Sequence, residues 1–101
     1  MADTTPSTTA LHYCHAHACT RACKPEYLMC RKHWNQVPHV NKVLVLSTYR
    51  PGQCEDKRPS NKWIIAANLA IAEVARMEGY PAEAQAYIMK AQWAIQRSKM
   101  N

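Results

Sequence analysis

One block of the sequence, CHAHACTRACKPEYLMCRKHW at residues 14–34, constrains the fold more than any other feature. It contains four of the chain's five cysteines and three of its five histidines. A chain of 101 residues buries only a modest hydrophobic core, so a disulfide or a bound metal would add needed stability. A disulfide framework, a redox centre, a metal site and a reduced loop packed as small apolar groups are the alternatives to be separated.

The rest of the sequence argues against disulfides. The N-terminal segment MADTTPSTTA has no apolar stretch of signal-peptide length, and no run of the chain approaches membrane-spanning length. We therefore expect a cytosolic (cytoplasmic) protein with no membrane partner. Because thiols in the cytosol are kept reduced, this expectation favours a metal site over a disulfide framework.

The spacing of the block suits a structural zinc site. Four residues separate Cys14 from Cys19, and two separate Cys30 from His33. Structural zinc takes four cysteine or histidine ligands in a tetrahedron, and four protein ligands leave no open position for hydrolytic chemistry. Cys30 and His33 would share one face of a helix that begins there. Spacing alone also allows substitute ligands, namely His15, His17 or Cys23.

Helix signals follow the block. Pro38 favours a short helix over residues 38–50, although the run VLVL within it is also strand-like. That helix would carry a broad apolar face, formed by Val40, Val43, Leu44 and Leu46. The Pro-Gly pair that follows predicts a turn, and residues 54–59 read as a charged loop.

Two longer helices are predicted in the C-terminal half, over residues 60–79 and 81–98. Ser60 is a suitable N-cap for the first, Gly79 a suitable stop, and Pro81 a suitable start for the second. The link between them is so short that an antiparallel hairpin is expected. Its apolar stripes should be Ile64, Ala67, Ile71 and Val74 on one helix and Ala84, Ile88, Ala91 and Ile95 on the other.

The fold class predicted from these signals is mainly α. A flexible tail, residues 1–10, would precede a single domain, residues 11–101. Within this domain a zinc-stabilised module, residues 11–36, would lead into the short helix and the hairpin. The hairpin leaves one aromatic side chain to explain, because Trp93 shares a face with Met89 and Ala86 that is distinct from the predicted stripe. That second face indicates either core packing or contact with a partner or a second copy of the chain.

Charge points to an acidic partner. The net charge is +6, and residues 1–62 hold nine basic against four acidic side chains. Four of the basic residues surround the predicted zinc site, namely Arg21, Lys24, Arg31 and Lys32. They could contact phosphates of a nucleic acid. They could equally solvate the surface and compensate the net −1 charge of three thiolates around Zn²⁺.

Part of the sequence resembles a known group. The motifs are Cys14-His15, Cys19, Cys30, His33-Trp34 and the run TYRPGQ at residues 48–53. This pattern is similar to that of small zinc-finger proteins encoded by bacteriophages and prophages, over about residues 12–75. The resemblance implies that Cys14, Cys19, Cys30 and His33 are the zinc ligands and that Cys23 is not one. The chain departs from the pattern in its C-terminal helix and in three residues, His17, Cys23 and Cys54, so His15, His17 and Cys23 stay possible substitutes.

These observations predict a binding protein rather than an enzyme. The sequence has no Ser/His/Asp order, phosphate loop or C-x-x-C redox pair. The phage resemblance implies a host protein partner, one that acts in nucleic-acid metabolism or defence. Direct DNA or RNA binding by the basic half is the second hypothesis, and a small zinc-dependent nuclease is the third.

Overall fold

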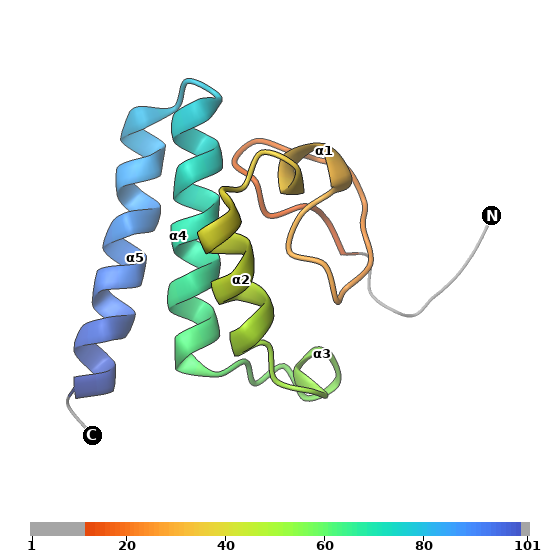
Figure 1. The fold of residues 1–101 in the computed structure, drawn as a ribbon, viewed down its shortest axis with the longest axis vertical. Helices are drawn as coiled ribbons and strands as arrows, with labels where there is room; N and C mark the ends of the chain where they lie inside the picture. The colour runs from red at the N-terminus through yellow and green to blue at the C-terminus, as the bar shows by residue number, and fades with distance from the viewer. Residues whose placement is uncertain (1–11, 100–101) are drawn as a thin grey trace.

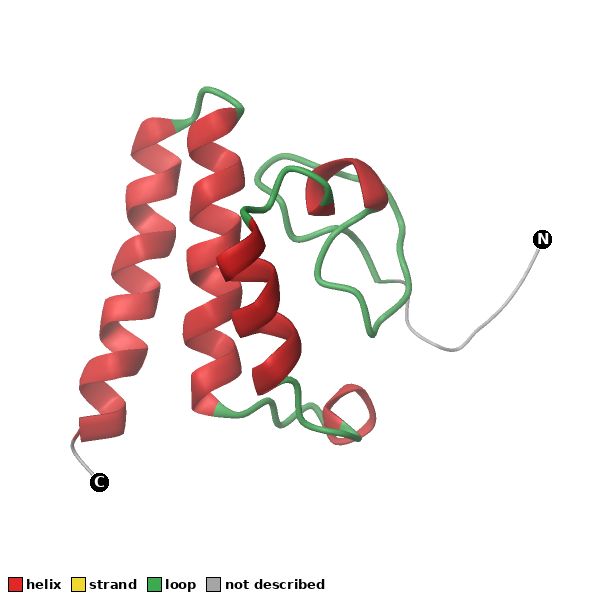
Figure 2. Cartoon of the chain, viewed as in Figure 1, coloured by secondary structure: helices red, strands yellow, loops and turns green. Residues whose placement is uncertain are grey.

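The computed structural model describes residues 12–99, so the tail predicted for residues 1–10 lies outside the described part. Figure 1 labels its helices, which are α1 (Arg31–Trp34), α2 (His39–Thr48), α3 (Gln53–Asp56), α4 (Asn61–Met77) and α5 (Pro81–Lys99). Within residues 12–99 extended pairing is limited to one isolated bridge between Tyr13 and Ala22, and loops make up the rest (Figure 2). The prediction of a mainly helical fold with a Cys/His module at its N-terminal end is confirmed.

The ends of α4 follow the capping chemistry of the sequence. The Ser60 hydroxyl accepts a hydrogen bond from the backbone N–H of Trp63 at 3.1 Å. At the other end the Tyr80 N–H donates to the Ala75 carbonyl at 2.8 Å, and Gly79 adopts a left-handed φ of 91°. This pairing closes the helix and leaves the left-handed position to glycine. Pro81 then begins α5, which returns antiparallel beside α4 (Figure 1).

The α4–α5 interface is built largely from alanine, which lets the two helix axes approach closely. The buried side of α5 consists of Ala84, Ala91 and Ala94. The predicted stripe is therefore wrong at its last position, because Ile95 is 38% exposed while its neighbour Ala94 is buried. The stripe on α4 is closer to the expectation, since Ala67, Ile71 and Val74 are all buried.

Helix α2 packs on the other flank of α4 and buries little of its own apolar surface. Val45 is its one buried residue. The predicted apolar face points mostly outward, with Val40, Val43, Leu44 and Leu46 all exposed. None of the described helices has both the length and the hydropathy needed to cross a bilayer.

The segment between α2 and α4 differs from the predicted charged loop, because residues 53–56 form the helical turn α3. Gly52 begins the turn with a left-handed φ of 85°. The Arg50 guanidinium pairs with the Asp56 carboxylate at 2.5 Å, and the Arg50 N–H donates to the Gln53 side-chain oxygen at 2.9 Å. These side-chain contacts close the turn, and the charge pattern alone does not reveal them.

The N-terminal module, residues 12–36, docks against one end of the hairpin. The Glu78 carboxylate at the end of α4 contacts His33 at 3.3 Å and accepts a hydrogen bond from the Gln36 amide at 3.0 Å. In the link between α4 and α5, the Tyr80 ring packs edge-on against the His17 ring with 4.8 Å between ring centroids. The module and the hairpin also share one buried core, in which Cys14, Ala16, Leu28, Met29 and Cys30 cluster with Ala67, Ala70, Ile71 and Val74.

Candidate metal centre

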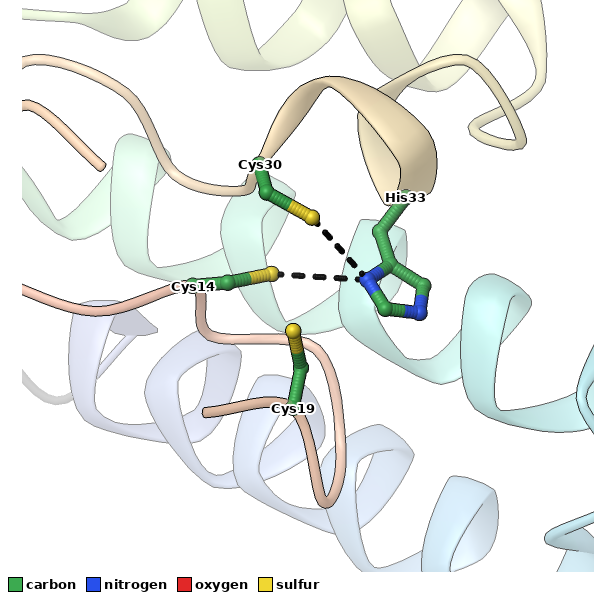
Figure 3. A group of neighbouring side chains, drawn as sticks. All are labelled: Cys14, Cys19, Cys30 and His33. Atoms are coloured by element: carbon green, nitrogen blue, oxygen red, sulfur yellow. Dashed lines mark hydrogen bonds between the residues drawn. The ribbon is translucent and has the colours of Figure 1, made fainter. Parts of the chain in front are cut away.

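Four side chains converge at the centre of the N-terminal module. The ligand atoms of Cys14, Cys19, Cys30 and His33 all lie within 4.8 Å of one another. Figure 3 shows the three sulfur atoms and one imidazole nitrogen pointing into the same small space. Cys14, Cys30 and His33 are buried, and Cys19 is half-buried. Three thiols and an imidazole within this distance of one another can bind a single metal ion.

The first two cysteines come from a short antiparallel loop. The Cys14 N–H donates to the Arg21 carbonyl at 2.8 Å, and the Cys23 N–H donates to the His12 carbonyl at 2.9 Å. Between these two paired segments the Cys19 N–H donates to the Ala16 carbonyl at 3.1 Å and closes a turn. This turn carries the Cys19 sulfur toward that of Cys14, although four residues separate them in the sequence.

The other two ligands come from the start of α1. Cys30 is its N-cap and His33 lies in the same single turn, so both side chains project from one side. His33 Nδ1 lies 3.3 Å from Cys30 Sγ and 3.6 Å from Cys14 Sγ (Figure 3). The opposite ring nitrogen, Nε2, contacts Glu78. The imidazole therefore has one nitrogen available to a metal and the other held by a carboxylate.

The pKa values of the two buried thiols, Cys14 and Cys30, are shifted in opposite directions. Burial raises the pKa of Cys14 to about 12, against the opposing effect of the backbone N–H groups of Cys30 and Ala16. Burial also acts to raise the pKa of Cys30, but hydrogen bonds from the His33 backbone N–H and from neighbouring side chains outweigh it and lower that pKa to about 6. These hydrogen bonds at the start of α1 thus favour the thiolate form of Cys30 over that of Cys14.

The three substitute ligands allowed by spacing lie outside this cluster. The His15 imidazole points to His12, with 3.3 Å between their Nε2 atoms, and the His17 ring packs on Tyr80. The Cys23 sulfur lies 3.6 Å from His12 Nδ1. All five cysteines of the chain are free thiols, as expected from the argument against disulfides.

The four basic residues that the sequence analysis named are all exposed. Lys24 and Arg31 line a groove beside the metal cluster. Lys32 acts on Glu78, whose carboxyl pKa is lowered mainly by the Gln36 amide and the His33 ring and to a smaller degree by Lys32. Arg21 is not among the residues that line this groove.

The groove is a feature that the sequence did not reveal. It has a volume of about 840 Å³ and runs between the 22–31 loop and the second half of α2. Trp34 and Trp63 are among its aromatic lining, and Leu46 adds an apolar wall. The buried Trp63 Nε1 has no hydrogen-bond partner within residues 12–99. Because Cys30 and its neighbours form one wall, the metal cluster and the shape of the groove are coupled.

Trp93 lies away from the groove, on the outer side of α5. It is 62% exposed, and Arg97 lies over its ring at 4.7 Å from the centroid. The core-packing alternative is therefore wrong for this residue.

No family model, curated protein or solved structure matches the chain.

Proposed function

We propose that the chain is a non-catalytic zinc-binding protein that attaches to a host protein acting in nucleic-acid metabolism or defence and modulates it. The observation that carries this proposal is the convergence of Cys14, Cys19, Cys30 and His33 within 4.8 Å. Zinc is the metal proposed because three sulfurs and one imidazole form a ligand set typical of structural zinc. The phage-like pattern in the sequence supports a partner in the host cell.

The non-catalytic role is supported by the ligand count and by the surroundings of the cluster. Four protein ligands satisfy tetrahedral zinc and leave no position for an activated water. The Glu78 carboxylate, which reaches the cluster through His33, is occupied by His33 Nε2 and Gln36. We therefore assign the metal to folding, and we assign binding to the surface that the metal holds in place.

The groove is the proposed contact surface for the host protein. Its lining is mostly apolar and aromatic, with the cations of Lys24 and Arg31 against the single carboxylate of Glu26. An apolar side chain flanked by carboxylates fits this combination. The proposed occupant is therefore an acidic, apolar segment of the host protein.

Direct binding of a single-stranded nucleic acid is the second candidate, favoured by the same aromatic and basic lining. Bases stack on exposed aromatic rings, and phosphates are neutralised by lysine and arginine. The protein partner is preferred because only Lys24 and Arg31 among the four basic residues lie at the groove.

A pull-down from host lysate tests the proposal and separates the two candidates. Tagged, zinc-loaded chain is used as bait, with and without nuclease treatment of the lysate. The expected result is one host protein that is retained in both arms and lost with Arg31→Glu. The matched control is Arg76→Glu, which changes an exposed arginine of α4 outside the groove.

The retained protein is then purified and titrated with the chain, and an acidic peptide from its contact segment should compete. Retention in the untreated arm alone, together with binding to generic single strands that weakens steeply with salt, would replace the host protein by nucleic acid. Retention that is unchanged by Arg31→Glu would remove the groove from the proposal.

A further inference from the structure

Helix α5 has two apolar faces, and the described chain covers only one of them. The alanines of the first face pack on α4. The second face is a row of exposed residues spaced alternately four and three apart. Its apolar members are Ala82, Ala86, Met89 and Trp93, and the polar Gln96 continues the spacing. Met89 is 59% exposed and Trp93 is 62% exposed. Alternating spacing of four and three is the pattern with which one helix pairs along another.

The charges beside this row are arranged end to end. Glu83, Lys90 and Arg97 are seven residues apart and therefore follow one edge of the face. The carboxylate of Glu83 has no hydrogen-bond or ion-pair partner within residues 12–99. Arg97, near the other end of the helix, stacks on Trp93 and so stands at the border of the exposed row.

We propose that the outer face of α5 is a homodimer interface, in which α5 packs antiparallel against α5 of a second copy about a two-fold axis near residue 90. This arrangement covers the exposed row of α5 and also pairs the opposite charges at its two ends. Residue numbers on the two copies then add to about 180, so Glu83 meets the second copy's Arg97 and Trp93 lies over the second copy's Ala86. A large ring opposite a small side chain, repeated by symmetry, fills the space between the helices.

The charge pattern is what selects a second copy as the occupant. In an antiparallel pair an edge of one helix faces the same edge of the other, so the acidic start of α5 faces its own basic end. Two attractive Glu83–Arg97 pairs result. The like charges of Lys90 near the axis oppose pairing, but each ammonium lies over Tyr87 of its own chain at 4.8 Å from the ring centroid.

The interface goes beyond the proposed host contact and is separate from it. The hollow beside Trp93 and the groove beside the metal cluster share no lining residue. A dimer formed through α5 would thus display two grooves, each available to a host protein. Failure of the dimer would leave the groove proposal untouched, because the dimer is tested without any host component.

Sedimentation equilibrium of the full, zinc-loaded chain tests the interface. With increasing concentration the mass should rise from the 11.5 kDa of one chain toward twice that value. Trp93→Ala should weaken dimerisation by roughly tenfold or more, because aromatic anchors dominate such interfaces. The matched control is Met77→Ala, which removes an exposed side chain of α4 instead. Far-UV circular dichroism checks that both variants are folded.

Charge reversal tests the antiparallel register. Glu83→Lys alone places two like-charged pairs across the interface, and so does Arg97→Glu, so each variant should be mainly monomeric where the unmodified chain is dimeric. An equimolar mixture of the two variants restores two attractive pairs. It should form a heterodimer with a Kd within about threefold of the homodimer value. The effects of the two reversals do not add, because each restores the attraction that the other removes.

Three results would overturn the proposal. The unmodified chain could stay monomeric at all concentrations, Trp93→Ala could dimerise as well as the control, or the mixture could fail to associate while each variant is folded. If a reversal unfolds the chain, Glu83→Gln and Arg97→Gln replace it, and each should weaken dimerisation through loss of the attractive pairs. Unchanged dimerisation in those neutral variants would overturn the register.

Discussion

At the scale of single residues, the two nitrogens of His33 connect the metal cluster to the hairpin. Nδ1 lies among the sulfurs, while Nε2 contacts the Glu78 carboxylate at 3.3 Å. A carboxylate on the far nitrogen fixes the tautomer and the orientation of a histidine ligand and makes it a better donor to metal. The side chain of Glu78 is fixed in turn by the Gln36 amide.

Removal of Glu78 should therefore weaken metal binding without removing a ligand. We expect Glu78→Ala to lower the zinc affinity by roughly 10- to 100-fold, which is the usual cost of losing such a support. Competition with a chromophoric chelator measures the change. Glu73→Ala is the control, because Glu73 is also on α4 but pairs with Arg76. Equal affinities of the two variants would mean that His33 needs no help from Glu78.

A second residue-scale prediction concerns Asp56. A hydrogen bond from the Arg50 guanidinium, followed by one from the Arg58 backbone N–H, lowers the pKa of this carboxyl below its ordinary value of 3.8. Since the folded-state pKa is depressed, the contact contributes stability above pH 3.8 and loses it as the pH falls through the lower, folded-state value. Arg50→Gln should raise the pKa of Asp56 most of the way back to its ordinary value. Carbon NMR of the Asp56 carboxyl during acid titration measures this change. A titration curve that does not move would exclude Arg50 as the cause.

The sequence predicted the residues of the cluster better than it predicted their support. Paired spacing brings Cys30 and His33 together because both lie in one helical turn. The contact between His33 and Glu78 joins residues 45 positions apart, and no local pattern encodes such a pairing. The groove was missed for the same reason, since its walls come from three separate segments.

At the scale of helices, the turn at Gly79 needs a left-handed backbone conformation, so a substitution there should lower the stability of the chain by a measurable amount. Its φ of 91° lies in the left-handed region, and a Cβ placed there would meet nothing within 4 Å. Gly79→Ala should therefore destabilise the chain by about 1 kcal/mol from backbone strain alone, without a clash. Urea unfolding measures the difference. Gly79→Asn should be milder, because asparagine tolerates left-handed backbone, and an alanine variant as stable as the original would contradict the prediction.

Helix starts and stops were predictable because each depends on a few adjacent side chains, such as the hydroxyl of Ser60 and the missing Cβ of Gly79. The face of α5 was less predictable. Its periodicity fits Ile95 as well as Ala94, and the close approach of α4 favours the smaller alanine at this point of the interface. The turn α3 depends on the Arg50–Asp56 ion pair, whose partners are six positions apart in a segment with no apolar period.

At the scale of the whole molecule, the metal cluster belongs to the main core. Cys14 and Cys30 cluster with Ala70 and Val74 of α4, and the half-buried Trp34 and Trp63 pack against the same group. Residues 15–29 lack a helix and hold few backbone hydrogen bonds of their own. Without a metal, the N-terminal module would be held only by these few local hydrogen bonds and by its contacts with the hairpin.

Removal of the metal should therefore unfold the N-terminal module and leave the alanine-packed α4–α5 hairpin as the last helical structure. Metal binding supplies folding free energy when the site does not exist in the unfolded chain. Hydrogen exchange followed by NMR, before and after chelation with verified metal loss, should show protection lost at the Cys14 and Cys23 amides and retained in the middle of α4. Cys30→Ser should behave like the chelated protein, whereas Cys23→Ser, whose sulfur lies outside the cluster, should bind metal and keep its protection. Amides that stay protected after complete removal of the metal would mean that packing against α4 is sufficient to fold the module.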